Sequence, residues 1–295
     1  MQLKVSDRIE NKVGNGELSG EDAGRFAAFV DRCNQDFMTH PVITDNQFCK
    51  WFASGAADRD IVKHFIIQFS VFSNLFLIAQ TLKVINAGSL EGMRASKEIL
   101  ANELGVIFHK PGARTQEVTD KDQEGDPEIV SIEGSVDGGT FRFRAAHFEW
   151  LLKMGAVLDI GFNDMGKRRN GTPATLFFCD QLMEIYGSED PNIAEGASFA
   201  VENWAAAGFW KQLVAGLEAF KQVEEPKLPL AFFTWHDRIE DQHAGHVMDE
   251  LEELYFTADF DEEKFLAGGR KMLGGVQAFW TGLNEHRIAA AFQTG

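Results

Sequence analysis

Hydrophobic residues recur at helical spacing along most of this chain. The spacing predicts helices over residues 22–37, 45–53, 58–85, 89–104, 145–160, 174–186, 191–223, 230–256 and 261–292. Gly88, Gly105 and the Pro226/Pro229 pair separate several of them. The first twenty residues are polar, which predicts a flexible N-terminus followed by one all-α domain over residues 21–295.

One segment has a different pattern. Residues 110–127 are polar and rich in Gly, Asp and Glu, which predicts a loop. Alternation over residues 129–134 and 140–144, on either side of the turn signal Asp137-Gly138-Gly139, predicts a pair of strands. We therefore expect residues 110–144 to form a loop and a β-hairpin inserted between two helices.

Polar residues interrupt the core-facing side of the helix predicted at 230–256. His236, Glu240 and His243 share one helix face with the apolar residues Phe232 and Leu251. Buried imidazole and carboxylate groups at this spacing can bind a metal, because ionisable groups are costly to bury unless they are paired or ligated. For this helix alone, a solvated His/Asp/Glu face is an equally good interpretation.

Three more predicted helices carry a similar residue on an apolar stripe: Glu103, His147 and Glu202. Each alone could cap a helix, pair with Arg, or form a hydrogen bond in the core. Together the four helices supply three Glu and three His, a mixed oxygen and nitrogen set that suits iron or manganese better than structural zinc. By contrast, His40, His64 and His286 lack a carboxylate at helical spacing, and we expect structural roles for them.

Composition narrows the function classes. The formal net charge of −17 argues against nucleic acid and anionic membrane surfaces as partners. Three cysteines without a CxxC pair and a polar N-terminal segment predict a cytoplasmic protein with free thiols. The apolar run at 65–79 contains Gln68 and Asn74, so we interpret it as a core helix or cavity wall with these two as candidate polar contacts, too short and polar to span a bilayer.

At these residues the chain resembles the haem-oxygenase-like di-iron oxidases, the metal-binding relatives of the TenA and PqqC folds. Glu103 in ILANELG, His147 in AHFEWL and Glu202 in VENWAAAGFW match the first three ligand positions of that family. His236, Glu240 and His243 match its final motif, H-x3-D/E-x2-H, and the resemblance spans about residues 20–290. About forty residues separate Glu103 from His147 where the family has about two turns, so His109 is a competing second ligand.

The resemblance implies a haem-oxygenase-like helical bundle that holds two Fe(II) ions, with Mn as an alternative. It implies activation of O₂ to oxidise a small organic substrate by N-oxygenation, C–C cleavage, desaturation or decarboxylation. Glu103, Glu202 and His236 would be catalytic as well as metal-binding, and a homodimer is a candidate assembly.

Three other interpretations remain open. A metal-free PqqC- or TenA-like enzyme would use His, Tyr, Arg or Cys, but the chain has only two Tyr and no Cys beside the six candidate ligands. A ferritin-like di-iron site needs two Glu-x-x-His pairs, and only Glu240/His243 fits. A non-enzymatic helical ligand-binding protein would use the same Glu and His residues to satisfy one another in its core.

Overall fold

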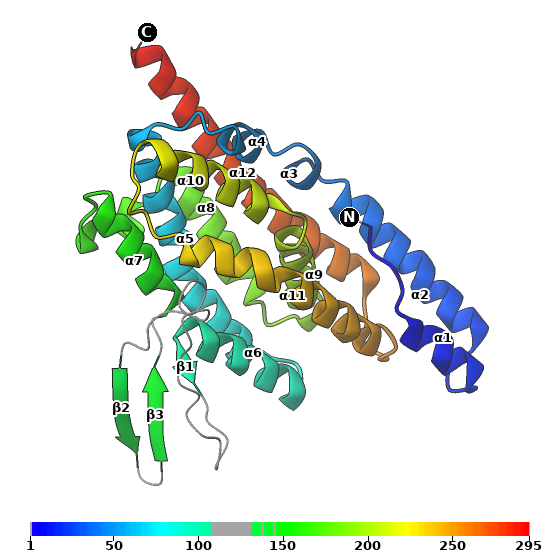
Figure 1. Ribbon diagram of the computed structural model, residues 1–295. Coiled ribbons are helices and arrows are strands. Elements are labelled where there is room, and N and C mark those ends of the chain that lie inside the picture. The colour runs from blue at the N-terminus through cyan, green and yellow to red at the C-terminus, as the bar shows by residue number, and fades with distance from the viewer. Residues whose placement is uncertain (1, 108–130, 137–138, 144–145, 295) are drawn as a thin grey trace.

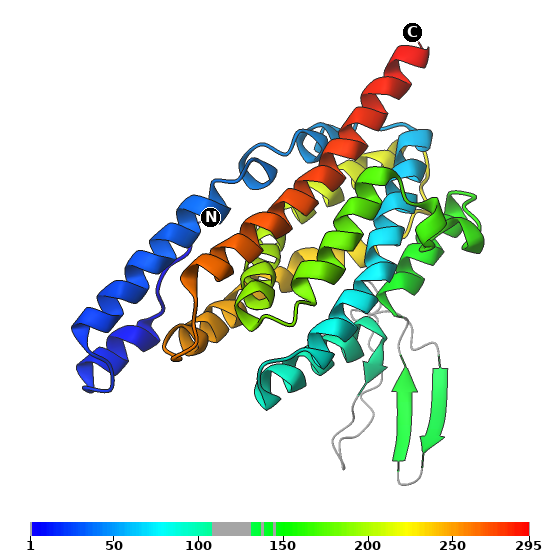
Figure 2. The same ribbon diagram turned by 180° about the vertical axis from the view of Figure 1, so that it is seen from behind.

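The structure is a computed structural model. It describes the backbone of residues 2–107, 131–136, 139–143 and 146–294, and the side chains of residues 2–90, 92–106, 146–238 and 248–292. The described part is mainly helical, with three short strands at one end (Figures 1 and 2).

The helices follow the predicted order. The α-helices are α1 (Asp7–Gly14), α2 (Gly20–Cys33), α3 (Pro41–Thr44), α4 (Gln47–Ala53), α5 (Arg59–Ile85), α6 (Leu90–Glu103), α7 (His147–Val157), α8 (Pro173–Gln181), α9 (Pro191–Ala205), α10 (Phe209–Val223), α11 (Ala231–Tyr255) and α12 (Glu262–Thr294). Two π-helical turns, η1 (Asn34–Met38) and η4 (Leu182–Tyr186), extend α2 and α8, and two 3-10 turns, η2 (Phe162–Asp164) and η3 (Arg168–Asn170), precede α8.

Polar caps explain where several helices begin. The side chains of Ser19, Asp58, Ser89 and Thr172 each accept a hydrogen bond from a backbone N–H in the first turn of α2, α5, α6 and α8. These bonds satisfy donors that a helix start leaves without a partner. The predicted starts near residues 22, 58, 89 and 174 are confirmed to within two residues.

The predicted helix over 191–223 is wrong, because the chain breaks between α9 and α10. Gly208 has a φ of +98° in the left-handed region, and the α10 helix starts directly after it. Only glycine adopts that conformation without strain, so the backbone can turn here. The apolar stripe runs on through the break, which is why periodicity alone predicts one continuous helix.

The N-terminal segment also differs from the prediction. Residues 7–14 form α1, the Leu3 N–H donates to Asn34 Oδ1 at 2.7 Å, and Ile9 is buried. Two isolated apolar side chains hold this segment, too few to give a clear helical pattern in a polar stretch.

α9 and α12 cross closely at the centre of the bundle. A Cβ atom on Gly196 would lie 1.9 Å from the backbone oxygen of Phe265, and one on Gly268 would lie 2.3 Å from that of Ile193. Glycine at both positions therefore lets the two backbones meet. A core rich in phenylalanine fills the space between these helices and α2, α4 and α5.

α5 is long and apolar enough, by length and composition, to cross a membrane, with 44% of the relevant window buried. The sequence analysis considered only residues 65–79 and judged that run too short and too polar to span a bilayer. The whole helix is longer and meets the length and composition needed. Gln68 and Asn74 are also not cavity contacts: Gln68 bonds Asn170, Thr172 and Thr175, and Asn74 Nδ2 donates to Gly166 O. They fasten the segment before α8 onto α5, as expected of a core helix.

Three strands form a small antiparallel sheet at the end of the molecule where α6 ends and α7 begins (Figure 1). They are β1 (Val106–Ile107), β2 (Ser131–Val136) and β3 (Gly139–Phe143), in the order β1-β3-β2. The loop predicted at 110–127 and the turn at 137–138 lie outside the described residues, so the inserted hairpin as a whole stays a prediction.

Candidate metal centre

The sheet brings together two candidate ligands that are far apart in the sequence. Val106 pairs with Phe143 and Ile107 with Arg142. Glu103 is the last residue of α6, just before β1, and His147 is the first residue of α7, just after β3. Pairing of β1 with β3 therefore closes the base of the insertion and places these two residues side by side.

The third candidate comes from α11. His236 lies one turn after Phe232, and its Nδ1 hydrogen bonds to the Phe232 carbonyl oxygen at 2.7 Å. Since a carbonyl can only accept, Nδ1 must carry the proton. This bond fixes the ring and leaves Nε2 as the nitrogen with a lone pair, an arrangement typical of histidines that bind metals.

Glu103, His147 and His236 converge. One ligand atom from each lies within 4.8 Å of the other two. His147 Nδ1 is 3.0 Å from Glu103 Oε2, and His147 is only 6% exposed. Two ligands that are each ~2.1 Å from one ion and about 90° apart would be separated by roughly the same distance.

The Nδ1 atom of His147 is also unsatisfied as a hydrogen-bonding group among the described residues. Nδ1 is buried and has no hydrogen-bond partner among the described residues, because the nearby Glu103 oxygen is not aligned to form one. A buried polar atom left this way costs about 1–3 kcal/mol. A carboxylate oxygen and an imidazole nitrogen 3.0 Å apart with no hydrogen bond between them are spaced as two ligands of one cation would be, so these residues fit a metal ion.

The dipoles of α6 and α7 also favour a bound metal ion at this place. Glu103 ends α6, where the helix carries partial negative charge, and His147 begins α7, where it carries partial positive charge. A carboxylate at the first position gains from a nearby cation, and a neutral imidazole suits the second better than a charged one. A metal ion satisfies both conditions.

Aromatic rings pack against the two histidines of the group. His147 lies 4.6 Å from the Trp235 ring and 5.1 Å from Trp150, and His236 lies 4.7 Å from Trp210 and 4.3 Å from Phe232. Such walls exclude water and lower the local dielectric, which strengthens interactions with any charge held inside.

Of the other predicted ligands, only Glu202 has a described side chain, and it is not part of this group. Glu202 is half-buried on α9, where its charge raises the pKa of Lys83 and of Tyr186. The side chains of Glu240 and His243 lie outside the described residues, although the α11 backbone carries them. His109 also lies outside, and of the two candidates for the second position the structure places His147 beside Glu103.

A second buried polar group escaped the sequence analysis. Lys83 Nζ donates to Ser198 Oγ at 2.6 Å and lies 3.5 Å from Glu195 Oε2. It also lies 4.8 Å above the Tyr186 ring, whose hydroxyl donates to Gln80 Oε1 at 2.8 Å. We call these five residues the Lys83 network; its signal in the sequence was Gln80 and Lys83 among the apolar residues near the end of α5.

Charge holds this network together. Burial lowers the pKa of Lys83, but Glu195 and the other acidic neighbours outweigh it, so the pKa is raised above its usual value. Burial raises the pKa of the Tyr186 hydroxyl, which stays protonated. Lys83 is therefore a buried cation that serves as the counter-ion for nearby carboxylates.

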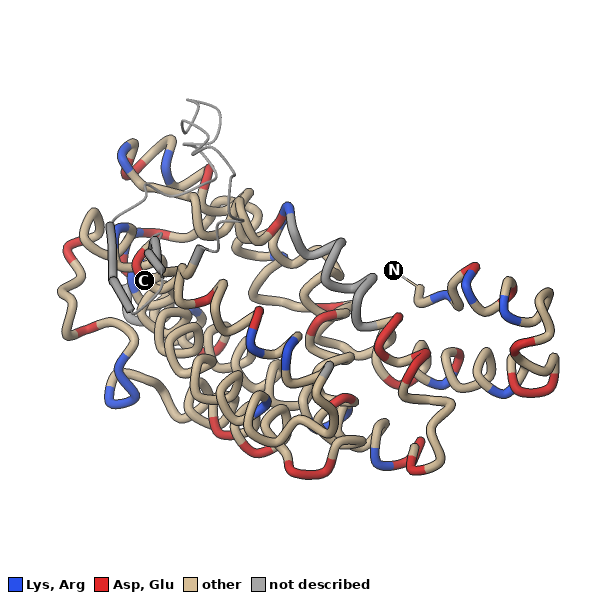
Figure 3. The backbone as a smooth tube through the Cα atoms, turned by 90° about the horizontal axis from the view of Figure 1, so that it is seen from below, with Lys and Arg blue, Asp and Glu red and all other residues tan. Residues whose placement is uncertain are grey.

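Outside this network, acidic positions are spread along most of the helices (Figure 3).

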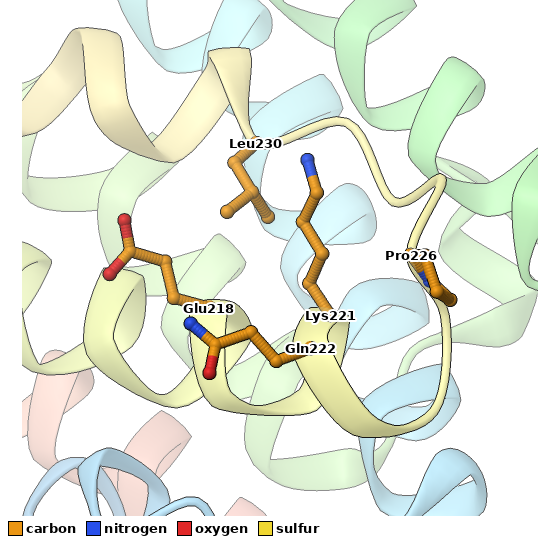
Figure 4. Close-up of a pocket in the computed structure, with 5 residues that line it drawn as sticks. All are labelled: Glu218, Lys221, Gln222, Pro226 and Leu230. Atoms are coloured by element: carbon orange, nitrogen blue, oxygen red, sulfur yellow. The ribbon is translucent and has the colours of Figure 1, made fainter.

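A surface depression is lined by none of the three residues. Figure 4 shows its lining: Glu218, Lys221 and Gln222 from the end of α10, with Pro226 and Leu230 from the segment that leads to α11. It is open to solvent and offers a single carboxylate, so it is a poor candidate for a metal centre.

The fold is shared with solved structures of low sequence identity. A domain of unknown function with a haem-oxygenase-like fold from Shewanella denitrificans has a TM-score of 0.57 and 16% identity, and covers 86% of this chain and 89% of its own. A TenA homologue from Pseudomonas syringae has a TM-score of 0.61 at 8% identity over 88% and 93%. A CADD-like protein of unknown function from Nostoc punctiforme has a TM-score of 0.57 at 16% identity over 89% and 98%.

No protein-family model and no curated protein matches the chain. The structural matches confirm the predicted haem-oxygenase-like fold with its TenA-like helical arrangement. At these identities they are evidence for the fold alone.

Proposed function

We propose that this protein is a non-haem di-iron oxidase or oxygenase that uses O₂ to oxidise a small organic substrate. The observation that carries the proposal is the buried, unpartnered Nδ1 of His147, held 3.0 Å from Glu103 Oε2 and close to His236. Glu103, His147 and His236 would hold the first ion. Glu202, Glu240 and His243 would hold the second.

The chemistry of the donors supports iron or manganese. One carboxylate and two imidazoles form a mixed oxygen and nitrogen set, which suits redox-active ions that keep open positions. When bound, ferrous iron would supply the electrons and Lewis acidity for O₂ activation.

The residues of the chain have separate tasks in this proposal. The Phe232 carbonyl orients His236 through Nδ1, and β1–β3 pairing fixes Glu103 against His147. Trp150, Trp210 and Trp235 exclude water from the substrate side. The outcome of the oxidation would depend on which substrate atom these walls place near the ions.

The test is an anaerobic titration with Fe(II), followed by exposure to O₂. We expect two irons per chain and a transient visible absorption band after O₂ is added. His147→Leu should lose one iron and the band, whereas His286→Ala, a change at an exposed histidine away from the site, should retain both.

Absence of metal uptake by the wild-type protein under these conditions would contradict the proposal and favour a non-enzymatic binding protein. Uptake that is equal in the His147→Leu variant would show that the metal binds elsewhere.

A further inference from the structure

All six tryptophans of the chain belong to one network of ring contacts that includes His236. The helices α4, α7, α9, α10, α11 and α12 each contribute one of them. The six are Trp51, Trp150, Trp204, Trp210, Trp235 and Trp280.

The network begins at the candidate metal centre. Trp210 stacks on His236 with ring centroids 4.7 Å apart and planes inclined by 19°. Phe209 lies 4.6 Å from Trp210, and Trp204 stacks on Phe209 at 4.3 Å with an angle of 5°. The break between α9 and α10 makes this stack possible, because it folds residue 209 back onto residue 204.

From Trp204 the network leads outward. Trp280 lies 6.4 Å from Trp204 and 5.6 Å from Phe209, so it contacts both. The Phe48 ring lies 5.7 Å from the Trp280 ring and 5.9 Å from the Trp51 ring, so it connects the two. Trp51 is half-buried, with the Arg287 guanidinium 4.5 Å above its ring, and marks the outer end.

The tryptophan and phenylalanine rings differ in how easily they are oxidised. Indole gives up an electron far more readily than phenylalanine, so Trp210, Trp204, Trp280 and Trp51 can each hold an electron vacancy while Phe209 and Phe48 act as spacers. The indole N–H groups of Trp150, Trp204, Trp210 and Trp280 are buried and have no hydrogen-bond acceptor among the described residues. An oxidised indole without an acceptor keeps its proton, and the vacancy can then move on by electron transfer alone.

We infer that this tryptophan chain conducts single electrons between the candidate metal centre and Trp51. The inference rests on the proposed function for its oxidant, which is formed from O₂ at the centre. When substrate is absent, the oxidant takes one electron from Trp210. Trp204, Trp280 and Trp51 refill the vacancy in turn, and a soluble reductant outside the protein donates the electron that restores Trp51.

A photochemical experiment tests the chain without any metal. A ruthenium tris-bipyridyl label is attached to Lys50→Cys, an exposed position next to Trp51; the native cysteines are buried. A light flash excites Ru(II), which gives one electron to a dissolved electron acceptor added as an oxidative quencher and becomes Ru(III). Ru(III) then takes one electron from Trp51 and returns to Ru(II). A vacancy that stays on one indole long enough to release the N–H proton to buffer leaves a neutral radical, which adds O₂ in aerated solution. Mass spectrometry of peptides then shows which tryptophans were oxidised.

We expect oxidation to reach Trp210 in the labelled parent. Trp280→Phe should lower the share at Trp210 several-fold and raise the share at Trp51. Trp204→Phe should have a smaller effect, because Phe209 contacts Trp280 directly. Phe178→Leu removes a buried ring that packs on Phe72 and Phe279 and lies off the path from Trp51 to Trp210, so it should leave the distribution unchanged. Melting curves confirm that each variant is folded.

The same variants loaded with Fe(II) and exposed to O₂ without substrate give the second arm. Oxidation should appear at Trp51 in the parent and be confined to Trp150, Trp204, Trp210 and Trp235 in Trp280→Phe. An unchanged distribution in Trp280→Phe under flash oxidation overturns the electron path, whatever the metal does. Flash transfer that depends on Trp280, combined with no metal uptake, would overturn the proposed function and leave the path standing.

Discussion

Two groups of buried polar side chains in this molecule are built in opposite ways. In the Lys83 network each polar group has a partner inside the protein: Lys83 has Ser198 and Glu195, and the Tyr186 hydroxyl has Gln80. In the group formed by Glu103, His147 and His236, the Nδ1 atom of His147 has none among the described residues.

The difference indicates what each group is for. A satisfied network stabilises the fold and needs nothing from outside, because its hydrogen bonds and charges compensate for their own burial. An unsatisfied nitrogen beside a carboxylate is costly until a ligand arrives. The first group therefore explains stability, and the second explains why we propose metal binding.

The largest expected effect is on metal affinity. Glu103→Ala should weaken Mn(II) binding at the first site by more than about 100-fold, since loss of even an outer partner of a ligand costs 10–100-fold. Electron paramagnetic resonance of free Mn(II) measures the affinity. Lys83→Met should leave this value within a few-fold of wild type; a similar loss in both variants would erase the distinction between the two groups.

Disruption of the Lys83 network should cost stability. Lys83→Met removes the buried cation and leaves Glu195 and Ser198 without it, so we expect the free energy of unfolding to fall by roughly 2–3 kcal/mol. Urea denaturation measures this change. The matched control is Lys264→Met, an exposed lysine paired with Asp190 at 2.7 Å, which should change the free energy of unfolding far less because solvent screens the pair.

His64 offers a comparison within the histidines. Its Nε2 is also buried without a partner among the described residues, but its ring stacks on His286 at 3.5 Å rather than meeting a carboxylate. Burial, assisted by His286, lowers the pKa of His64 to about 4. We therefore expect pH sensitivity here instead of metal binding.

Thermodynamic linkage gives the direction in which pH changes the free energy of unfolding. Between about pH 6.5 and pH 4 the unfolded chain binds a proton at His64 that the folded chain does not, so stability is complete above about pH 6.5 and falls by roughly 1–2 kcal/mol as the pH decreases toward 4. His64→Phe should flatten this slope in denaturation measured from pH 7 to pH 4. A slope equal to that of wild type would show that other groups cause it.

The smallest expected effect is the most specific. In metal-free protein, His147→Leu should not lower the free energy of unfolding, because the nitrogen that it removes is costly to bury and has no hydrogen bond to lose. Adding Mn(II) should raise the melting temperature of wild type and not of this variant. A large loss of stability in the metal-free variant would mean that His147 serves the fold itself.

Much of the fold was predictable because it depends on local signals. Ser19, Asp58 and Ser89 begin helices where the sequence has a cap before an apolar stripe. The break at Gly208 was not predictable in this way, because the apolar stripe continues through it and only the positive φ shows the turn. The N-terminal helix was missed because it is held by a few long-range contacts, such as Leu3 with Asn34.

The residue types of the candidate site could be predicted from the sequence, but the proximity of these residues in space could be predicted less well. Polar residues on apolar stripes identified Glu103, His147 and His236, which the structure brings together. Their proximity depends on the pairing of β1 with β3 across about forty residues, and a two-residue strand such as β1 leaves almost no pattern in a sequence. The assignments of all six residues as ligands stay predictions.

The most direct measurement is anomalous diffraction at the iron edge from crystals grown or soaked anaerobically with Fe(II). The account predicts a peak within bonding distance of His147 Nδ1, Glu103 Oε2 and His236 Nε2 at once. Crystals that take up iron but show no peak among these three side chains would contradict it.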